Sequence, residues 1–206
     1  MGNFSLVVLD FETSGLSPGH GDRPIEIGAV LIRNNQVVDR FQSLMNPGFR
    51  VNSFIEDYTG ISNKMLAGAP PCAEVMKKFA GFISGHHLAA HNASFDQKFL
   101  DAELSRLKLK RDKDFACTML VARRLYQSAP NHRLETMVRH TGIEAQAQFH
   151  RALADAEMTG YLWLRMIAHI KEKYGIKTLP FQVMQHLAKV SKRGVDSFLS
   201  NQHAEP

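Results

Sequence analysis

The chain has only two cysteines, Cys72 and Cys117, among its 206 residues. They fall in a predicted helix start and a predicted strand, so they do not form the disulfide framework typical of small secreted proteins. The chain also lacks an apolar run near the roughly 18 residues of a membrane helix, and its N-terminus lacks the pattern of a signal peptide. We therefore expect a cytoplasmic protein with no membrane contact.

The excess of positive charge is small, a formal net +5, but it is unevenly distributed. Between residues 106 and 139, nine lysines or arginines stand against three acidic residues, and nine minus three leaves +6. Such a basic rim steers and holds a polyanion such as a nucleic acid. A solvated helix surface is the alternative for residues 108–113. The nine basic residues are Arg106, Lys108, Lys110, Arg111, Lys113, Arg123, Arg124, Arg133 and Arg139.

Two acidic residues stand two residues apart after a short apolar run near the N-terminus, as Asp10-x-Glu12. The run predicts a buried strand that ends at Asp10, and the two-residue period of a strand aims both carboxylates at one side. Two further acids stand at predicted helix starts. Asp96 opens one helical pattern, and Asp155 follows His150 by five positions at the start of another.

These four carboxylates suit hard divalent cations, which prefer oxygen ligands. In two-metal phosphodiester hydrolysis, one ion prepares the attacking water and the other stabilises the leaving oxygen. A neutral histidine can accept the proton of that water near neutral pH, and His150 is the candidate. Taken singly, each acid is more typical of a turn or a helix cap. The joint pattern favours a metal-dependent nuclease site.

Four segments carry a resemblance to a known family. The chain resembles the DEDDh 3′–5′ exonucleases, the DnaQ-like group that includes proofreading subunits of bacterial DNA polymerase III. The resemblance runs from about residue 4 to residue 170, and it implies a ribonuclease-H-like α/β fold, two Mg²⁺ or Mn²⁺ ions, and release of nucleoside 5′-monophosphates from a 3′ end. The matching segments are residues 9–16, 25–30, 90–96 and 150–156.

The resemblance also assigns roles to individual residues. It implies that Asp10, Glu12, Asp96 and Asp155 bind the metals and that His150 is the general base. Phe11 departs from the smaller polar residue often found there, and we expect its side chain on the opposite strand face. The residues that the resemblance implies for binding the terminal nucleotide and shaping its pocket are Thr13, Gly15, Leu16, Asn92 and Phe95.

The order of predicted elements agrees with that fold. Strands at 4–10, 24–33 and 36–45 precede shorter strands at 87–90 and 114–117, and the second and third form a hairpin around Asn34-Asn35. Helices are predicted at 71–83, 95–107, 118–126, 133–141 and 151–173, with short helical pieces over 51–67. We therefore expect an α/β, ribonuclease-H-like protein with a mixed central β-sheet flanked by α-helices.

We expect residues 1–173 to form the exonuclease domain and residues 174–206 to form a C-terminal helical extension with a polar tail. Residues 179–190 have the spacing of a small amphipathic helix. One interpretation is a tail that docks a DNA polymerase or clamp. A helix packed on the domain with a frayed terminus is favoured over it.

The resemblance, together with the site residues, implies a 3′–5′ exonuclease acting on DNA 3′ ends, preferably single-stranded or frayed. The nearest alternative is an RNA-trimming exoribonuclease with the same five residues, since contacts to a 2′-hydroxyl are not visible in a sequence. A non-catalytic polymerase-docking module is a further alternative. It is disfavoured because all five chemical residues are present.

Overall fold

The computed structural model describes residues 4–144 and 151–203, and its centre is a five-stranded mixed sheet in the order β3-β2-β1-β4-β5. Three long strands, β1 (Leu6–Thr13), β2 (Pro24–Arg33) and β3 (Gln36–Leu44), pair antiparallel. Two short strands, β4 (His87–Ala90) and β5 (Phe115–Cys117), continue the sheet parallel to β1. The predicted hairpin is confirmed, and Asn34 and Asn35 take φ angles of 51° and 63° at its turn, as a type I′ turn requires.

The first strand differs from its prediction. It was expected at 4–10, but β1 spans Leu6–Thr13, because Asp10 to Thr13 pair with residues 24–28 of β2. The two acids of the first motif therefore lie inside a paired strand rather than at its end. This pairing fixes the positions of Asp10 and Glu12 more firmly than a turn would.

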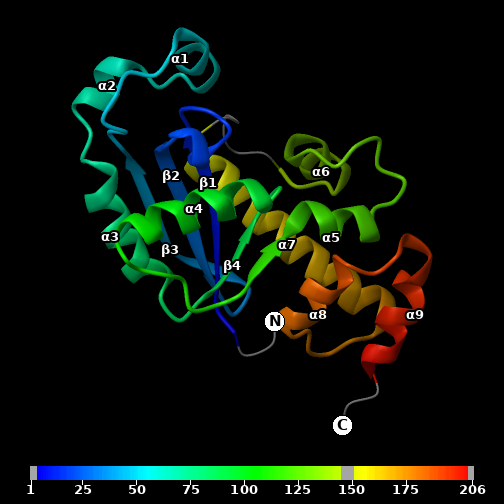
Figure 1. The fold of residues 1–206 in the computed structure, drawn as a ribbon. Coiled ribbons are helices and arrows are strands. Elements are labelled where there is room, and N and C mark those ends of the chain that lie inside the picture. Colours follow the sequence, from blue (N-terminus) through cyan, green and yellow to red (C-terminus); the bar gives the residue numbers. More distant parts are fainter. Residues whose placement is uncertain (1–3, 145–150, 204–206) are drawn as a thin grey trace.

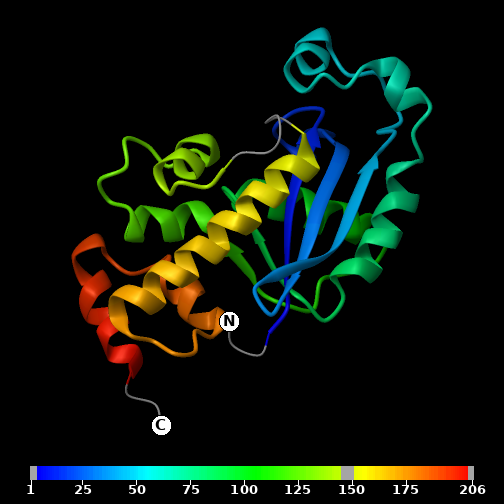
Figure 2. The ribbon, with the colours of Figure 1, turned by 180° about the vertical axis from the view of Figure 1, so that it is seen from behind.

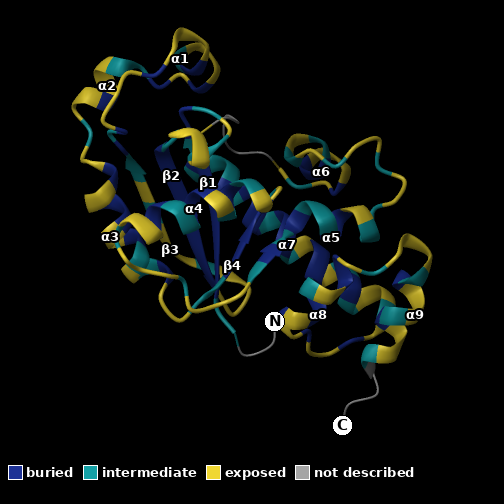
Figure 3. Cartoon of the chain, in the orientation of Figure 1, coloured by how far each residue is buried: buried dark blue, intermediate teal, exposed yellow. Residues whose placement is uncertain are grey.

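Helices cover both faces of the sheet (Figures 1 and 2). One face packs on α3 (Cys72–Ile83) and α4 (Ser94–Arg106), through a cluster that takes Val7, Leu9 and Phe11 from β1. The other packs on α7 (Ala152–Tyr174), α5 (Thr118–Leu125) and α8 (Phe181–Leu187), through a cluster that takes the alternate residues Leu6 and Val8. Figure 3 shows the resulting buried strands β1 and β2. The predicted α/β layering is confirmed.

Helix α7 lies directly against β2 at its N-terminal end. A Cβ atom on Gly28 would lie 2.0 Å from the backbone nitrogen of Leu153, so only glycine allows this approach. Farther along, the backbone of Gly160 faces Val30 and Ile32 of the same strand. These contacts fix the distance between α7 and the sheet, and they fix the position of Asp155 in the first turn of α7.

A helical arm extends beyond the upper end of the sheet in Figure 1. It consists of α1 (Ser53–Thr59) and α2 (Asn63–Ala67), capped by the side chains of Asn52 and Ser62. Its underside has a small apolar cluster of its own. That cluster comprises Ile25, Val51, Ile55, Ile61 and Leu66.

The C-terminal segment packs on α7. After α8 come a 3₁₀ turn, η2 (Lys192–Gly194), then α9 (Val195–Ser200) and η3 (Asn201–His203). Val195 and Leu199 are buried in the same cluster as α7. The end of the chain is therefore not a wholly polar tail, because these two side chains of a short helix face inward. The remaining elements are η1 (Pro18–His20) and α6 (Leu134–His140), and no described helix is long and apolar enough to span a membrane.

Candidate active site

One cavity of about 710 Å³ lies at the ends of β1 and β4, under the helical arm. Three segments far apart in the chain meet there: residues 10–16, residues 91–96 and the first turn of α7. All the predicted metal ligands and nucleotide contacts that the structure describes line it. They are Asp10, Glu12, Thr13, Gly15, Leu16, Asn92, Phe95, Asp96 and Asp155.

Three carboxylates converge in this cavity. Asp10 and Glu12 project from the same face of β1, as the two-residue period predicted, and Asp155 reaches them from α7. One carboxylate oxygen from each lies within 4.8 Å of the others. A group of three oxygen donors this close is a suitable site for a hard divalent cation.

Asp96 reaches the same cavity from the other side of the sheet. It lies in the first turn of α4, is 2% exposed, and accepts a hydrogen bond of 3.1 Å from the backbone N–H of Phe11. The Phe11 side chain packs away from the carboxylates, with its ring centroid 6.4 Å from that of Phe79. The expected orientation of Phe11 is therefore confirmed, and its backbone positions Asp96.

The carboxylates raise one another's pKa values. The pKa of Asp10 is raised well above its ordinary value by burial first, and then by the charges of Asp96, Glu12 and Asp155. Burial, with the charges of Asp155 and Glu26, raises the pKa of Glu12 to about 7. Burial also raises the pKa of Asp96 to about 8. This concentration of negative charge binds protons or cations, and the donors fit a divalent metal.

Glu26 is a residue near the site to which the sequence reasoning assigned no role. It is fully buried, and it faces Glu12 across the β1–β2 pair. Its carboxylate accepts hydrogen bonds from Arg151 at 2.7 and 3.2 Å, from the backbone N–H of Ala152 at 3.2 Å, and from Gln42 at 3.1 Å. Glu26 thus ties the start of α7 to β2. A glutamate within the apolar run of residues 25–32 was the signal that could have found it.

The loop after β1 is shaped by short polar contacts. The hydroxyl of Thr13 donates to the carbonyl of Gly15 at 2.6 Å. A Cβ atom on Gly15 would lie 2.4 Å from the carboxylate of Asp22, so a larger residue there would displace this side chain, which accepts from the Ser17 N–H at 2.9 Å. Leu16 is 76% exposed at its tip, which suits the apolar wedge implied by the family resemblance.

The loop after β4 forms the opposite wall. Asn92 takes a φ angle of 70°, and its carbonyl accepts from the backbone N–H of Phe95 at 2.9 Å. His91 contacts the Thr118 hydroxyl through Nδ1 and the His132 carbonyl through Nε2, each at 2.8 Å. Burial lowers the pKa of His91 to about 4, so it is neutral at physiological pH. These contacts hold the loop that presents Asn92, Phe95 and Asp96.

His150, the predicted general base, lies outside the described residues. The residue after it, Arg151, is anchored to Glu26 as described above.

The basic stretch divides between the two ends of the sheet. Residues 107–114 precede β5, which runs parallel to β1, so this loop lies at the end opposite Asp10 (Figure 1). Arg111 there pairs with Asp101 at 2.9 Å. Arg124 donates to the Val190 carbonyl at 2.6 Å and so supports the C-terminal segment. Arg133 is exposed, and it follows His132, which contacts the cavity-lining His91.

Comparisons with known proteins cover most of this chain. A family model described as an exonuclease matches residues 7–163. The chain is 41% identical over 170 residues to the PolC-type DNA polymerase III of Bacillus cereus, and 38% identical over 171 residues to that of Bacillus subtilis. Each match covers 82% of this chain and 12% of the relative. The chain thus spans a small part of the length of these relatives.

Solved structures share the fold at lower identity. Exonuclease X in complex with 5′ overhanging duplex DNA matches with a TM-score of 0.70 at 23% identity, covering 89% of this chain and 99% of that one. The nuclease domain of 3′hExo, a DEDDh family member bound to rAMP, matches with a TM-score of 0.68 at 21% identity, covering 80% and 92%. The predicted ribonuclease-H-like fold is therefore confirmed.

Proposed function

Because this chain belongs to the exonuclease family, we propose that it is a metal-dependent 3′–5′ exonuclease that releases nucleoside 5′-monophosphates from DNA 3′ ends. The resemblance to DEDDh exonucleases is confirmed by that membership. One observation carries the proposal beyond it. The carboxylates and the predicted nucleotide contacts come from three distant segments and line a single cavity.

Exonucleases of this family are metal-dependent, and the carboxylates fit that requirement. Asp10, Glu12 and Asp155, together with Asp96, would hold two divalent ions, Mg²⁺ or Mn²⁺. When bound, such ions supply an activated water and stabilise charge on the leaving oxygen. The role of the four residues is to hold the ions at the scissile phosphate, from rigid positions on β1, α4 and α7.

His150 is the general base in this proposal. Its assignment rests on the His150-x-x-x-x-Asp155 motif and on its place next to the anchored Arg151. His150→Ala should lower turnover by roughly 10²–10⁴-fold and leave DNA affinity near wild type, since only the proton acceptor is removed. Single-turnover rates across pH check this. An unchanged rate with an unchanged acid limb would place the base elsewhere.

The shape of the cavity supports removal of terminal nucleotides. Thr13 and Gly15 form one wall, Asn92 and Phe95 form the other, and the exposed Leu16 stands at the rim. In this proposal the four wall residues hold the last nucleotide, and Leu16 separates its base from the next. A pocket with two walls and a wedge accepts a chain end more readily than a chain interior.

DNA is the proposed substrate because the relatives at 38–41% identity are named as DNA polymerases. Exonuclease X was solved with DNA, whereas the 3′hExo domain was solved with a ribonucleotide at 21% identity. RNA is therefore the second candidate. A non-catalytic docking module is disfavoured, because the three clustered carboxylates persist without an evident structural benefit.

A DNA polymerase or clamp is the proposed protein partner, on the strength of the PolC-type relatives. Docking through residues 174–206 would have to use polar surface. The described part of that segment has no large apolar side chain among the strongly exposed ones, and Val195 and Leu199 are buried.

The test uses one sequence in three forms: 5′-labelled single-stranded DNA, the same strand with a mispaired 3′ end in a duplex, and the equivalent RNA. Each is incubated with Mg²⁺ and with Mn²⁺, and Asp10→Asn serves as the control. We expect a ladder that shortens from the 3′ end, with nucleoside 5′-monophosphates as products and DNA preferred. Internal cleavage, 3′-monophosphate products, or equal activity in Asp10→Asn would contradict the proposal.

A further inference from the structure

Two aromatic side chains on the helical arm are largely exposed to solvent. Phe54 is 69% exposed and Tyr58 is 57% exposed. They stand four residues apart on α1, so they share one helix face. Their rings stack, with centroids 5.9 Å apart and planes inclined by 12°. Most of the described aromatic residues lie in the hydrophobic clusters or pack against them, so an exposed pair on one helix face is unusual.

The opposite face of α1 anchors the arm. Ile55 and Thr59 are buried, and Ile55 joins the small apolar cluster beneath the arm. The Thr59 hydroxyl donates to the Ile55 carbonyl at 2.7 Å, and the side chain of Asn52 accepts from the Ile55 N–H at 3.0 Å. The exposed pair is therefore carried by a helix whose position is fixed by other residues.

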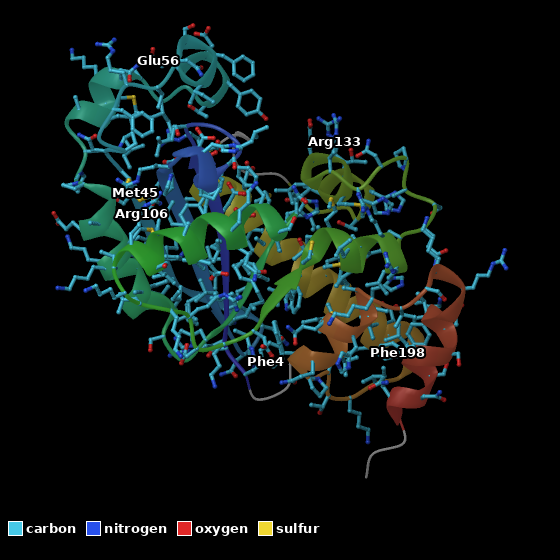
Figure 4. All side chains as sticks on the ribbon, viewed as in Figure 1. Phe4, Met45, Glu56, Arg106, Arg133 and Phe198 are labelled. Atoms are coloured by element: carbon cyan, nitrogen blue, oxygen red, sulfur yellow. The ribbon has the colours of Figure 1, made fainter. Side chains whose placement is uncertain are left out.

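Phe54 and Tyr58 line the same cavity as the carboxylates. Leu16, the most exposed large apolar residue described, also lines it. In Figure 4 the labelled Glu56 marks the arm on one side, and the labelled Arg133 marks the α6 side of the molecule. The aromatic pair thus adds an exposed apolar surface, carried by the arm, to the cavity that holds the proposed terminal-nucleotide contacts.

The charge of α1 determines which part of a nucleic acid suits this surface. Its sequence contains Glu56 and Asp57 and no lysine or arginine. Such a helix does not attract phosphates, so its ligand must be recognised through its apolar faces. Unpaired bases have such faces, and they stack on aromatic side chains with little dependence on sequence.

We propose that Phe54 and Tyr58 form a stacking surface for unpaired bases of the strand that lie just 5′ of its terminal nucleotide. The inference rests on the proposed exonuclease function and names the feature that selects single-stranded ends. Bases in a duplex are already stacked on their neighbours, so a paired end cannot use this surface without fraying. Binding through the pair does not involve ion release, so it depends little on salt.

The experiment compares Phe54→Ala/Tyr58→Ala with two other variants. Phe54→Tyr/Tyr58→Phe keeps both rings, and Leu109→Ala removes an exposed apolar residue on the loop at the opposite end of the sheet. The substrates are a 12-nucleotide oligothymidylate and a single-nucleotide ester, the p-nitrophenyl ester of thymidine 5′-monophosphate. The second substrate has no upstream bases.

For the double alanine variant we expect KM for the oligonucleotide to rise about 10- to 100-fold, the loss of roughly one stacked base. Its kcat should stay within about twofold of wild type, and its kcat/KM on the ester should not change. The conservative variant should restore the affinity, and the Leu109 control should resemble wild type. The slope of log affinity against log salt should be the same in all four proteins.

Binding alone provides an independent readout. In an Asp10→Asn background, 2-aminopurine at the second position from the 3′ end should be quenched on binding, and the double alanine change should abolish that quenching. This arm separates the inference from the proposed function, since it needs no hydrolysis. Equal losses on the oligonucleotide and the ester would overturn the inference. Unchanged quenching in the double alanine variant would overturn it as well.

Discussion

Buried or half-buried carboxylates lie at two places in this molecule, one on α4 and one in the cavity, and their charges are balanced differently. Glu103 on α4 is 1% exposed and pairs with Arg23 and Arg106, each at 2.6 Å. Asp10, Glu12 and Asp96 form no ion pair with any side chain in the part of the chain that the structure describes. The first group is neutralised within the fold, whereas the second is left with raised pKa values.

The difference indicates what each group does. Burying a carboxylate costs free energy unless a partner balances it, so an unbalanced cluster persists where it has a function. Glu26 stands between the two cases. It faces Glu12 across the strands, but its charge is taken up by Arg151. The fold therefore neutralises one glutamate to position α7, and leaves its neighbour available for a cation.

The largest expected effect comes from removing a carboxylate of the unbalanced group. Asp10→Asn should lower hydrolysis by on the order of 10³-fold or more, because a metal ligand contributes several kcal/mol to the transition state. The metal-free fold should be as stable as wild type or more so, since one buried charge is gone. Glu103→Gln should do the reverse, losing stability and keeping activity. Hydrolysis rates and urea unfolding of both variants check this. Equal changes in rate and in stability in the two variants would show that the two sites do not differ in function.

Glu26→Gln tests the residue that stands between these two cases. It keeps the size of the side chain but leaves Arg151 without its carboxylate. We expect metal affinity and turnover to fall by about 10- to 100-fold, as happens when groups that orient ligands are removed. Glu103→Gln, its control, should be destabilised without a change in Mn²⁺ affinity. Losses of Mn²⁺ affinity that are equal in both variants would mean that Glu26 contributes only to general stability.

The carboxylates in the cavity should also make the stability of the metal-free protein depend on pH. Because the pKa of Glu12 is raised to about 7, the folded metal-free protein binds a proton that the unfolded chain has already lost. Its free energy of unfolding should therefore fall as pH rises from about 5 to 8, by on the order of 1–3 kcal/mol. Glu12→Gln should lack this component, and Mn²⁺ should remove it from wild type. Parallel curves for the two metal-free proteins would contradict the assignment.

The smallest expected effect concerns two exposed cations, one on the cavity side of the molecule and one at the opposite end of the sheet. Arg133→Glu, near the cavity, should weaken DNA binding and reduce the salt slope by about one. Lys110→Glu, on the loop at the opposite end of the sheet, should change neither. Titrations of labelled DNA over a salt series distinguish them. A similar loss in both variants would indicate a general charge effect.

Local patterns predicted much of this molecule. The strand period placed Asp10 and Glu12 on one face, and the Asn34-Asn35 pair marked the hairpin turn. Contacts between distant segments were not predictable. Glu26 and Arg151 are 125 positions apart, and the Phe11 N–H meets Asp96 only because α4 begins at the end of the neighbouring strand.

Strand direction likewise separated residues that are close in sequence. The stretch 106–139 was interpreted as one basic rim, yet β5 carries the chain from one end of the sheet to the other within it. Arg111 and Arg133 therefore serve different parts of the molecule. The inward-facing Val195 and Leu199 depend on α7, and the short sequence around them has no local signal for that packing.

The most direct test of the central claim is calorimetric titration of the metal-free full chain with Mn²⁺. Wild type and Glu103→Gln should bind two ions with similar affinity, whereas Asp10→Asn should lose at least one of them. Binding should strengthen as pH rises from 6 to 8, because protons compete for the same carboxylates. Equal Mn²⁺ binding by wild type and Asp10→Asn, or none by wild type, would contradict the claim that this cluster holds the catalytic metals.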